Sequence, residues 1–239
     1  MINATGELSF LYRGLRALAG FRLAVIRALV CHGHFIRARA INRYIAGHSV
    51  RKLHLSATKT LPGFLNSQIT GQVPIDITRP LPLADQTFDL IFSSHLIEHI
   101  HRKQCLSFLA EALRVLRPGG IQIIATPSAE RIYRALYGDD DQARQILVDD
   151  SSRFYDDGFL TPCHYANLSM RAFGHRFLLD RGFLEAACQR IGYSKVEVVS
   201  IENIHDQALR DYLGSSKSPR WDMETEIFLL HKASEPCVE

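Results

Sequence analysis

Hydroxyl, imidazole and carboxyl groups are concentrated between Ser93 and His99, directly after a short apolar run. Ser93, Ser94 and His95 can all hydrogen-bond a polar ligand, and an imidazole also accepts protons near neutral pH. His95, Glu98 and His99 follow one another in the spacing H-x-x-E-H. On a continuous helix the two histidines share a face, where they could hold zinc with Glu98 as a general base. The alternative is a local polar network at a helix start, where the helix dipole favours the negative charge of Glu98.

A second acid–base candidate lies far downstream, where His175 is followed by Asp180. The two could act as a general base and the acid that orients it. They could equally form a structural pair that pins the preceding segment in place. The sequence leaves both interpretations open.

The residues around Ser93 are positioned by a strand–helix–strand unit. Residues 88–93 form an apolar run that suits a buried strand, and apolar residues recur at helical spacing over 95–116. Pro118 cannot continue this helix, and Gly119–Gly120 can adopt the positive φ that reverses the chain. Residues 121–125 form a second buried strand. A unit of this length must cross over, so the two strands are expected to be parallel with a right-handed connection.

Ligands of open parallel sheets bind outside the carboxyl ends of the strands. In this unit the two ends carry Ser93–Ser94–His95 and Thr126–Pro127–Ser128. We therefore expect His95 and Thr126 at the ends of adjacent strands, beside a polar ligand.

These residues also carry a family resemblance. LPLADQTFDLIFSSHLIEHI, then LRVLRPGG and a strand that ends in TPS, resembles the post-cofactor half of class I S-adenosylmethionine-dependent methyltransferases. The chain is most similar to the predicted methyltransferases with the pattern lPGW-N-D … EHxIEH … RVLKPGG, and Gly174–His175–Arg176–Phe177 with Asp180 resembles their wGHkF-YD segment. The resemblance covers about residues 44–232. It implies S-adenosylmethionine as cofactor and a doubly wound, Rossmann-like α/β sheet, mostly parallel, with seven strands in residues 51–239.

The remaining elements follow from local pattern and from this resemblance. Strands are expected at 52–55, 73–77, 195–201 and 225–231, the last two as an antiparallel pair, and the resemblance implies a further strand that ends at Gln68. Helices are expected at 129–137 and 183–191, the latter ended by Gly192. Residues 138–174 show no strand pattern and are rich in aromatic and polar side chains, so we expect a lid-like insert over the site.

The resemblance implies a set of cofactor-binding positions, in which this chain departs twice from the family. Ser56–Ala57–Thr58 stands where the family has a Gly-x-Gly turn that lets the backbone approach the cofactor. Gln68 stands where the family has an acid for the ribose hydroxyls, and a neutral amide makes the weaker bond. The implied cofactor-binding residues are Ser56, Ala57, Thr58, Asn66, Gln68, Asp76, Ile77, Ser93 and Ser94.

Methyl transfer requires alignment of the acceptor with the methyl group and exclusion of water, and an oxygen acceptor also needs a base. His95 is the first candidate for this work and His175 the second. The function implied is methyl transfer to a small molecule or a glycan intermediate. The alternatives are a non-catalytic relative with weakened or lost cofactor binding and, more remotely, an H-x-x-E-H zinc hydrolase. No metal is expected, because the resemblance explains the motif and no third ligand stands out downstream.

The composition is that of an ordinary globular protein with one uneven feature. The five cysteines are scattered and never spaced C-x-x-C, which argues for a reducing compartment, so we expect a cytoplasmic protein. Residues 1–52 hold nine Lys or Arg against one Glu, a net +8 within a chain of +3, so the remainder carries −5. Residues 1–50 are therefore expected to form a basic arm, with helices at 8–31 and 35–45. This arm either packs on the body or contacts an anionic membrane or nucleic acid, although no clear nucleic-acid signature is present.

Overall fold

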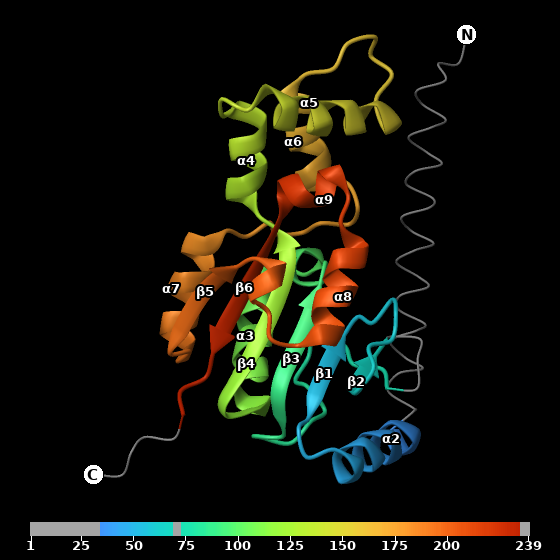
Figure 1. Cartoon of the computed structure of the whole chain (residues 1–239), viewed down its shortest axis with the longest axis vertical. Helices are drawn as coiled ribbons and strands as arrows, with labels where there is room; N and C mark the ends of the chain where they lie inside the picture. Colours follow the sequence, from blue (N-terminus) through green and yellow to red (C-terminus); the bar gives the residue numbers. More distant parts are fainter. Residues whose placement is uncertain (1–33, 69–72, 235–239) are drawn as a thin grey trace.

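A six-stranded sheet runs through the centre of the computed structural model, which describes residues 34–68 and 73–234 (Figure 1). The order across the sheet is β2-β1-β3-β4-β6-β5. The first four strands in this order are parallel, whereas β6 is antiparallel to both β4 and β5. The predicted α/β class, the parallel central unit and the antiparallel final pair are confirmed. The strands are β1 Lys52–Leu55, β2 Phe64–Ser67, β3 Phe88–Ser94, β4 Leu116–Pro127, β5 Lys195–Val199 and β6 Thr225–His231.

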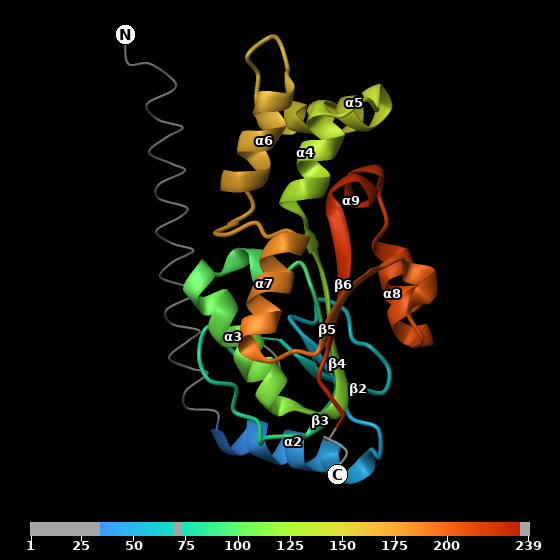
Figure 2. The same ribbon diagram turned by 90° about the vertical axis from the view of Figure 1, so that its left-hand side faces the viewer.

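Helices cover both faces of the sheet (Figure 2). On one face, α3 (Arg102–Val115) and α7 (Arg181–Ile191) bury apolar side chains against the strands in the larger core cluster. On the other face, α8 (Gln207–Ser216) packs over a second apolar cluster together with the short η3 (Ile201–Asn203). α9 (Pro219–Glu224) then leads into β6. The sheet is thus doubly wound.

The predicted strand at 73–77 is wrong, so the described sheet has six strands instead of seven. Pro74 has no N–H to donate to a neighbouring strand. The Asp76 carboxylate accepts hydrogen bonds from the N (3.0 Å) and Oγ1 (2.6 Å) of Thr78, which favours a local turn. The segment still contributes apolar side chains to the larger core, namely Val73, Ile75 and Ile77.

The predicted helix over 95–116 is shorter than expected. His95 has a φ of 47°, a left-handed conformation that an α-helix cannot contain. One 3₁₀ turn, η1 (Ile97–His99), follows, and α3 begins at Arg102. His101 caps α3 in a reciprocal arrangement with Gln104, whose Oε1 accepts a hydrogen bond from the His101 backbone at 3.0 Å. His95 and His99 therefore do not lie one turn apart on a continuous helix.

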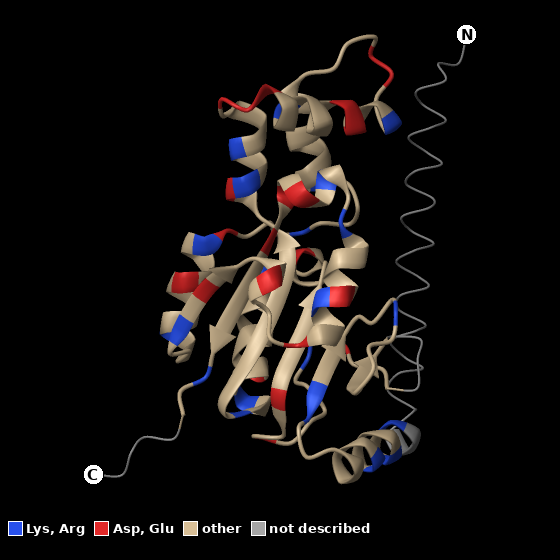
Figure 3. Cartoon of the chain, viewed as in Figure 1, with Lys and Arg blue, Asp and Glu red and all other residues tan. Residues whose placement is uncertain are grey.

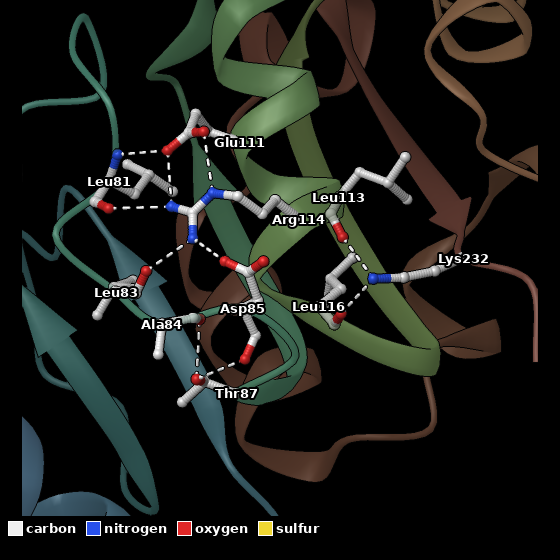
Figure 4. Close-up of polar contacts among 10 residues, drawn as sticks. All are labelled: Leu81, Leu83, Ala84, Asp85, Thr87, Glu111, Leu113, Arg114, Leu116 and Lys232. Atoms are coloured by element: carbon white, nitrogen blue, oxygen red, sulfur yellow. Dashed lines mark hydrogen bonds and ion pairs between the residues drawn. The ribbon is translucent and has the colours of Figure 1, made fainter. Parts of the chain in front are cut away.

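An arginine near the end of α3 fixes the loop that leads into β3 (Figure 4). The Arg114 guanidinium donates to the carbonyls of Leu81 (3.0 Å) and Leu83 (2.9 Å). It also pairs with Asp85 (2.6 Å) and with Glu111 (2.7 Å), whose carboxylate in turn accepts from the Leu81 backbone N–H at 2.7 Å. The first arginine of LRVLRPGG thus holds the loop that leads into β3.

A helical excursion lies beyond the carboxyl ends of the parallel strands (Figures 1 and 2). It comprises α4 (Ala129–Tyr137), α5 (Asp141–Asp150), η2 (Ser151–Arg153) and α6 (Pro162–Arg171), which share an apolar core of their own. The excursion begins and ends side by side, because Ser128 and Leu179 form an isolated bridge. We call residues 129–179 the helical excursion. The helix predicted at 129–137 is confirmed as α4.

The basic arm is described in part. The predicted helix at 35–45 is confirmed as α2 (His34–Gly47), and it packs Ile41 and Tyr44 into the larger core. The Tyr44 hydroxyl hydrogen-bonds the carbonyls of Lys52 (2.9 Å) and Gly63 (2.8 Å), which joins α2 to β1 and to the turn before β2. The helix predicted at 8–31 lies outside the described residues. Among the described helices, none has the length and apolar character needed to cross a bilayer.

Candidate active site

The ends of β3 and β4 bring His95 and Thr126 together, as predicted. The His95 backbone N–H donates to the Ala125 carbonyl at 2.8 Å, so His95 sits directly beside the end of β4. Its imidazole Nε2 is hydrogen-bonded with the Thr225 hydroxyl at 3.2 Å, and its Nδ1 lies 3.4 Å from Glu98 Oε1. The His95 side chain is 31% exposed, so it remains accessible to a ligand.

Glu98 is a fully buried carboxylate at the centre of this region. Thr126 Oγ1 donates to its Oε2 at 3.1 Å, whereas its Oε1 has no hydrogen-bond partner among the described residues. Burial acts to raise the pKa of Glu98, but the imidazole of His95 and the charge of His99 outweigh it and lower the pKa. Glu98 is therefore a buried anion surrounded by imidazoles.

The helical excursion returns to the sheet at this carboxylate. The backbone N–H groups of Arg176 (2.7 Å) and Phe177 (3.2 Å) both donate to the Glu98 carbonyl. This docking carries His175 to within 5.1 Å of His99, measured between ring centroids, with the rings at 67°. Gly174 supplies the positive φ of 81° that the chain adopts before His175, a conformation that other residues rarely take.

The protonation of His175 is set by its neighbours. Its Nδ1 lies 2.6 Å from the Ser169 carbonyl, which can only accept, so Nδ1 carries the hydrogen and Nε2 keeps its lone pair. Burial lowers the pKa of His175, which favours the neutral ring. His175 is therefore a neutral imidazole that presents Nε2.

The predicted pairing of His175 with Asp180 is wrong. Asp180 is the N-cap of α7, and its carboxylate accepts a hydrogen bond from the Phe183 N–H at 2.8 Å. The acid beside a candidate base is instead Glu98, next to His95. A carboxylate at a helix cap and one beside a catalytic base look alike in a sequence.

The motif H-x-x-E-H also needs correction. The described residues whose ligand atoms lie within 4.8 Å of one another are Glu98, His99 and His175. His95 is outside this group, because its left-handed backbone directs it toward Thr225. No third ligand stands out downstream in the sequence, and the fold brings His175 beside Glu98 and His99.

The turn after β1 keeps the backbone shape that glycine usually provides. Ser56 has a φ of 58°, in the left-handed region. Ala57 is buried, and its N–H donates to the Ser67 carbonyl at the end of β2 at 2.9 Å. Thr58 is exposed. A tight turn at the end of β1 has thus been preserved without glycine.

Strand register brings the other predicted cofactor positions to the same edge. Leu55 is paired with Ser67 on one side and Ser93 on the other, so Ser56, Gln68 and Ser94 follow at the ends of three adjacent strands. Ser93 is buried, and its Oγ has no hydrogen-bond partner among the described residues. Ser94 is partly exposed and Gln68 is exposed. The carboxyl end of the sheet therefore presents the Ser93 hydroxyl, which has no partner among the described residues, close to the more exposed Ser94 and Gln68.

Asn66, Asp76 and Ile77 are engaged elsewhere in the fold. The Asn66 side chain accepts from the Leu61 N–H (2.8 Å) and donates to the Leu61 carbonyl (3.0 Å), which clamps the turn before β2. Asp76 bonds Thr78, and Ile77 is buried in the larger core. These contacts assign a structural part to all three residues, and their proposed contacts with the cofactor stay predictions.

A cavity of about 510 Å³ opens beside this edge. Its lining combines residues of α2, such as Arg43 and Tyr44, with Ala57, Asn66 and Gln68. β1 and β2 are joined by residues 56–63, which form no helix. The cavity therefore lies next to a parallel connection shorter than the dozen residues that usually hold a crossover helix.

The residues present fit S-adenosylmethionine at this edge. The turn at Ser56 adopts the required positive φ, and the buried Ser93 hydroxyl lacks a protein partner. Ser56, Ala57, Gln68 and Ser94 would hold the cofactor, since they surround the strand ends.

Residues of β6 and α9 also contribute to the site, and they were not predicted from the sequence. Thr225 contacts His95, and the neighbouring Glu224 accepts a buried hydrogen bond from the Tyr165 hydroxyl at 2.5 Å. Arg220 pairs with Glu224 at 3.3 Å and with Asp150 at 3.3 Å. These contacts tie the helical excursion to the sheet. Isolated polar residues in an unpatterned segment gave no signal for them.

Comparison with known proteins gives the following matches. Residues 46–124 match the family model described as "Methyltransferase domain". No curated protein matches the chain. Solved structures that resemble it include the CurJ carbon methyltransferase (13% identity, TM-score 0.43, 77% of this chain and 49% of that chain). The citrinin polyketide synthase CMeT domain is 11% identical with a TM-score of 0.45, over 80% of this chain and 48% of that chain. A SAM dependent methyltransferase from Archaeoglobus fulgidus is 13% identical with a TM-score of 0.45, over 84% of this chain and 94% of that chain.

The chain spans about half the length of the first two of these structures. The matched segment, residues 46–124, holds the turn after β1, the carboxyl ends of β1, β2 and β3, Glu98 and the motif around Arg114. Residues 46–124 are therefore similar to a methyltransferase domain, and they lie within a doubly wound sheet.

Proposed function

We propose that the protein transfers a methyl group from S-adenosylmethionine to a small-molecule or glycan-type acceptor. The observation that carries this proposal is the register of β2, β1 and β3, which places Ser56, Gln68 and Ser94 side by side. His95 follows directly and is partly exposed, so a cofactor at the strand ends and an acceptor at His95 would be neighbours.

When bound, S-adenosylmethionine supplies a methyl group on a sulfonium centre, which is a good leaving group. The chain's own residues then have to orient the acceptor and exclude water. The helical excursion stands beyond the strand ends and docks on Glu98 through Arg176 and Phe177, which suits the exclusion of water.

His95 has the surroundings of a general base for an oxygen acceptor. With its Nδ1 hydrogen directed at Glu98 Oε1 (3.4 Å), its Nε2 accepts from the Thr225 hydroxyl at 3.2 Å, and the hydroxyl of an acceptor would take the place of Thr225. The Glu98 carboxylate would stabilise the imidazolium that forms when Nε2 takes the proton. His175, on the other side of Glu98, is the second candidate and would act through its own Nε2.

We propose one partner for the strand ends and another for the basic arm. At the strand ends the partner is the acceptor, of small-molecule or glycan type. For the basic arm of residues 1–50 the proposed partner is an anionic membrane surface, and the proposed location of the protein is the cytoplasm. A non-catalytic relative that has lost its cofactor is the rival function, because Gln68 lacks the charge of the family's acid.

Calorimetry with S-adenosylmethionine tests the enzyme against this rival. Loss of a charge-assisted hydrogen bond costs about 1.5–3 kcal/mol, which weakens binding by roughly one to two orders of magnitude. We therefore expect weak, sub-millimolar binding by the natural chain. The triple variant Gln68→Asp, Ser56→Gly, Thr58→Gly should bind at least tenfold more tightly, because it restores the charge and relieves the left-handed φ at Ser56.

Two further variants sharpen this experiment. Gln189→Asp, on the exposed side of α7, makes the same charge change away from the site and should leave the affinity unchanged. Thr58→Gly alone should weaken binding if the Thr58 hydroxyl contacts the cofactor directly. Absence of binding at millimolar concentration by both the natural chain and the triple variant would leave the non-catalytic function in its place.

A further inference from the structure

The group formed by Glu98, His99 and His175 has the chemistry of a metal site. A neutral imidazole, a second imidazole and a carboxylate each offer one ligand atom, and these atoms lie within 4.8 Å of one another. Glu98 Oε1 is 3.8 Å from His99 Nε2. We propose that these three residues bind a divalent transition cation, zinc foremost, independently of S-adenosylmethionine.

The buried carboxylate is the first observation behind this proposal. Glu98 has no exposed surface, and its Oε1 has no hydrogen-bond partner among the described residues. A buried charge is costly unless it is paired or coordinates a metal. The imidazole nitrogens at 3.4 Å (His95) and 3.8 Å (His99) are farther away than the roughly 2.7–2.9 Å of a charge-assisted hydrogen bond. Oε1 thus has loose ion-pair contacts with the two imidazoles and no partner at the distance of a charge-assisted hydrogen bond.

The orientation of His175 is the second observation. Histidines that bind metals usually donate their other ring N–H to a carbonyl or carboxylate, which fixes the tautomer. His175 does this through Nδ1, 2.6 Å from the Ser169 carbonyl, and so presents the lone pair of Nε2. Gly174 and the docking of Arg176 on the Glu98 carbonyl hold the ring beside His99.

The ligand set indicates which cation would bind. Two imidazoles and one carboxylate suit zinc and its neighbours in the first transition series, and are too rich in nitrogen for calcium or magnesium. Three protein ligands leave one tetrahedral position for water or an anionic group, as in catalytic zinc sites. Ligand atoms around bound zinc lie about 3.3 Å apart, so side-chain torsions would have to contract the group by about 1.5 Å at most.

Metal loading of the purified full chain, without an affinity tag, tests the proposal. After chelator treatment and dialysis against zinc, elemental analysis should find one zinc per chain. His99→Ala and His175→Ala should each weaken zinc binding at least tenfold. Cobalt bound in place of zinc should show the visible absorption of a four-coordinate site, which reports the geometry without any variant.

Two control variants separate this site from its rivals. His205→Ala removes an exposed histidine elsewhere on the surface and should leave zinc binding unchanged. His95→Ala should also retain one zinc, whereas a site built on His95 and His99 would lose it. Circular dichroism identifies any variant that fails to fold, and His175→Gln serves as the milder replacement in that case.

Three results would overturn the proposal. The first is a folded natural chain that takes up no zinc at micromolar concentration, which would leave Glu98 balanced by a protonated histidine. The second is equal zinc retention by the natural chain and both His99→Ala and His175→Ala. The third is loss of zinc in His95→Ala with retention in His175→Ala. None of these results depends on cofactor binding, so the methyltransferase proposal stands or falls separately.

Discussion

At the scale of single residues, burial of polar side chains couples the fold to pH. His54 lies on β1 with no exposed surface, packed against the rings of Phe92 and Tyr212. Burial lowers its pKa from 6.5 to about 4, and the hydrogen bond with Asn66 opposes this in part. The folded state therefore keeps His54 neutral at pH values where the unfolded chain already binds a proton.

Because of His54, we expect the free energy of unfolding to fall in mild acid. Below pH 6.5 His54 is protonated in the unfolded chain, whereas in the folded protein it stays neutral down to about pH 4. The free energy of unfolding therefore falls as the pH falls from 6.5 to about 4. Between pH 7.5 and pH 5 the loss from His54 should be about 2 kcal/mol. Urea unfolding at the two pH values should show this loss in the natural chain and a smaller one in His54→Gln.

The control for this prediction is His205→Gln, which removes an exposed histidine. It should leave the difference between the two pH values unchanged. An equal pH dependence in His54→Gln and the natural chain would show that His54 does not titrate abnormally.

The residues of the site were predictable to different degrees. His95 and Thr126 could be placed from the sequence, because the carboxyl ends of parallel strands meet at one edge. The contact between His99 and His175 could not, since it depends on how the helical excursion returns to Glu98. The sequence left the role of Asp180 open, because helix capping and catalysis use the same residue types, and the structure shows Asp180 as the N-cap of α7.

At the scale of elements, local chemistry explains where the predictions succeeded and failed. Apolar runs with clear breaks gave β1, β3, α4 and β6 close to their observed bounds. The strand expected at 73–77 was lost to Pro74 and to the Asp76–Thr78 turn, and the helix expected from His95 was delayed to Arg102. Apolar periodicity fixes which side chains are buried but not whether a short segment pairs with a neighbouring strand.

The loop before β3 depends on one side chain of α3. Arg114 makes hydrogen bonds to two carbonyls and ion pairs with Asp85 and Glu111 (Figure 4). Arg114→Ala should lower the free energy of unfolding by about 2–3 kcal/mol, because the carbonyls of Leu81 and Leu83 lose their donor. Urea titration should show a lower midpoint with an unchanged slope.

Arg114→Lys and Arg134→Ala make this prediction specific. Lysine keeps the charge but lacks the planar fork of donors. Arg114→Lys should therefore recover less than half of the stability that Arg114→Ala loses. Arg134 forms an exposed pair with Glu130 on α4, and Arg134→Ala should change stability by less than about 0.5 kcal/mol. Equal effects of Arg114→Ala and Arg134→Ala would show that Arg114 is an ordinary surface residue.

At the scale of the whole molecule, the basic helix α2 and the helical excursion lie at opposite ends. α2 stands beside the amino ends of the parallel strands, whereas the helical excursion rises beyond their carboxyl ends (Figures 1 and 2). The charges follow this division, with a cluster of arginines on α2 and acidic side chains in the loops of the excursion (Figure 3). A surface bound by α2 would leave the strand ends facing away from it.

This arrangement gives the proposed membrane contact a form that can be tested. Ile41 and Tyr44 attach α2 to the core, while Arg39 and Arg43 are exposed. Each basic residue near an anionic bilayer contributes about 1 kcal/mol, so Arg39→Glu with Arg43→Glu should weaken co-sedimentation with phosphatidylserine liposomes at least tenfold. Reversal of Arg13, Arg16 and Arg27, which lie outside the described residues, should abolish it.

Salt and a matched variant decide whether the contact is electrostatic and local to the arm. Binding should weaken steeply as salt rises, because screening shortens the reach of surface charges. Arg134→Glu with Arg190→Glu makes the same charge change on α4 and α7, away from α2, and should leave co-sedimentation nearly intact. If the natural chain does not bind anionic liposomes at low salt, the arm keeps only its packing role. Equal losses in the two double variants would instead show that net charge, rather than the arm, governs binding.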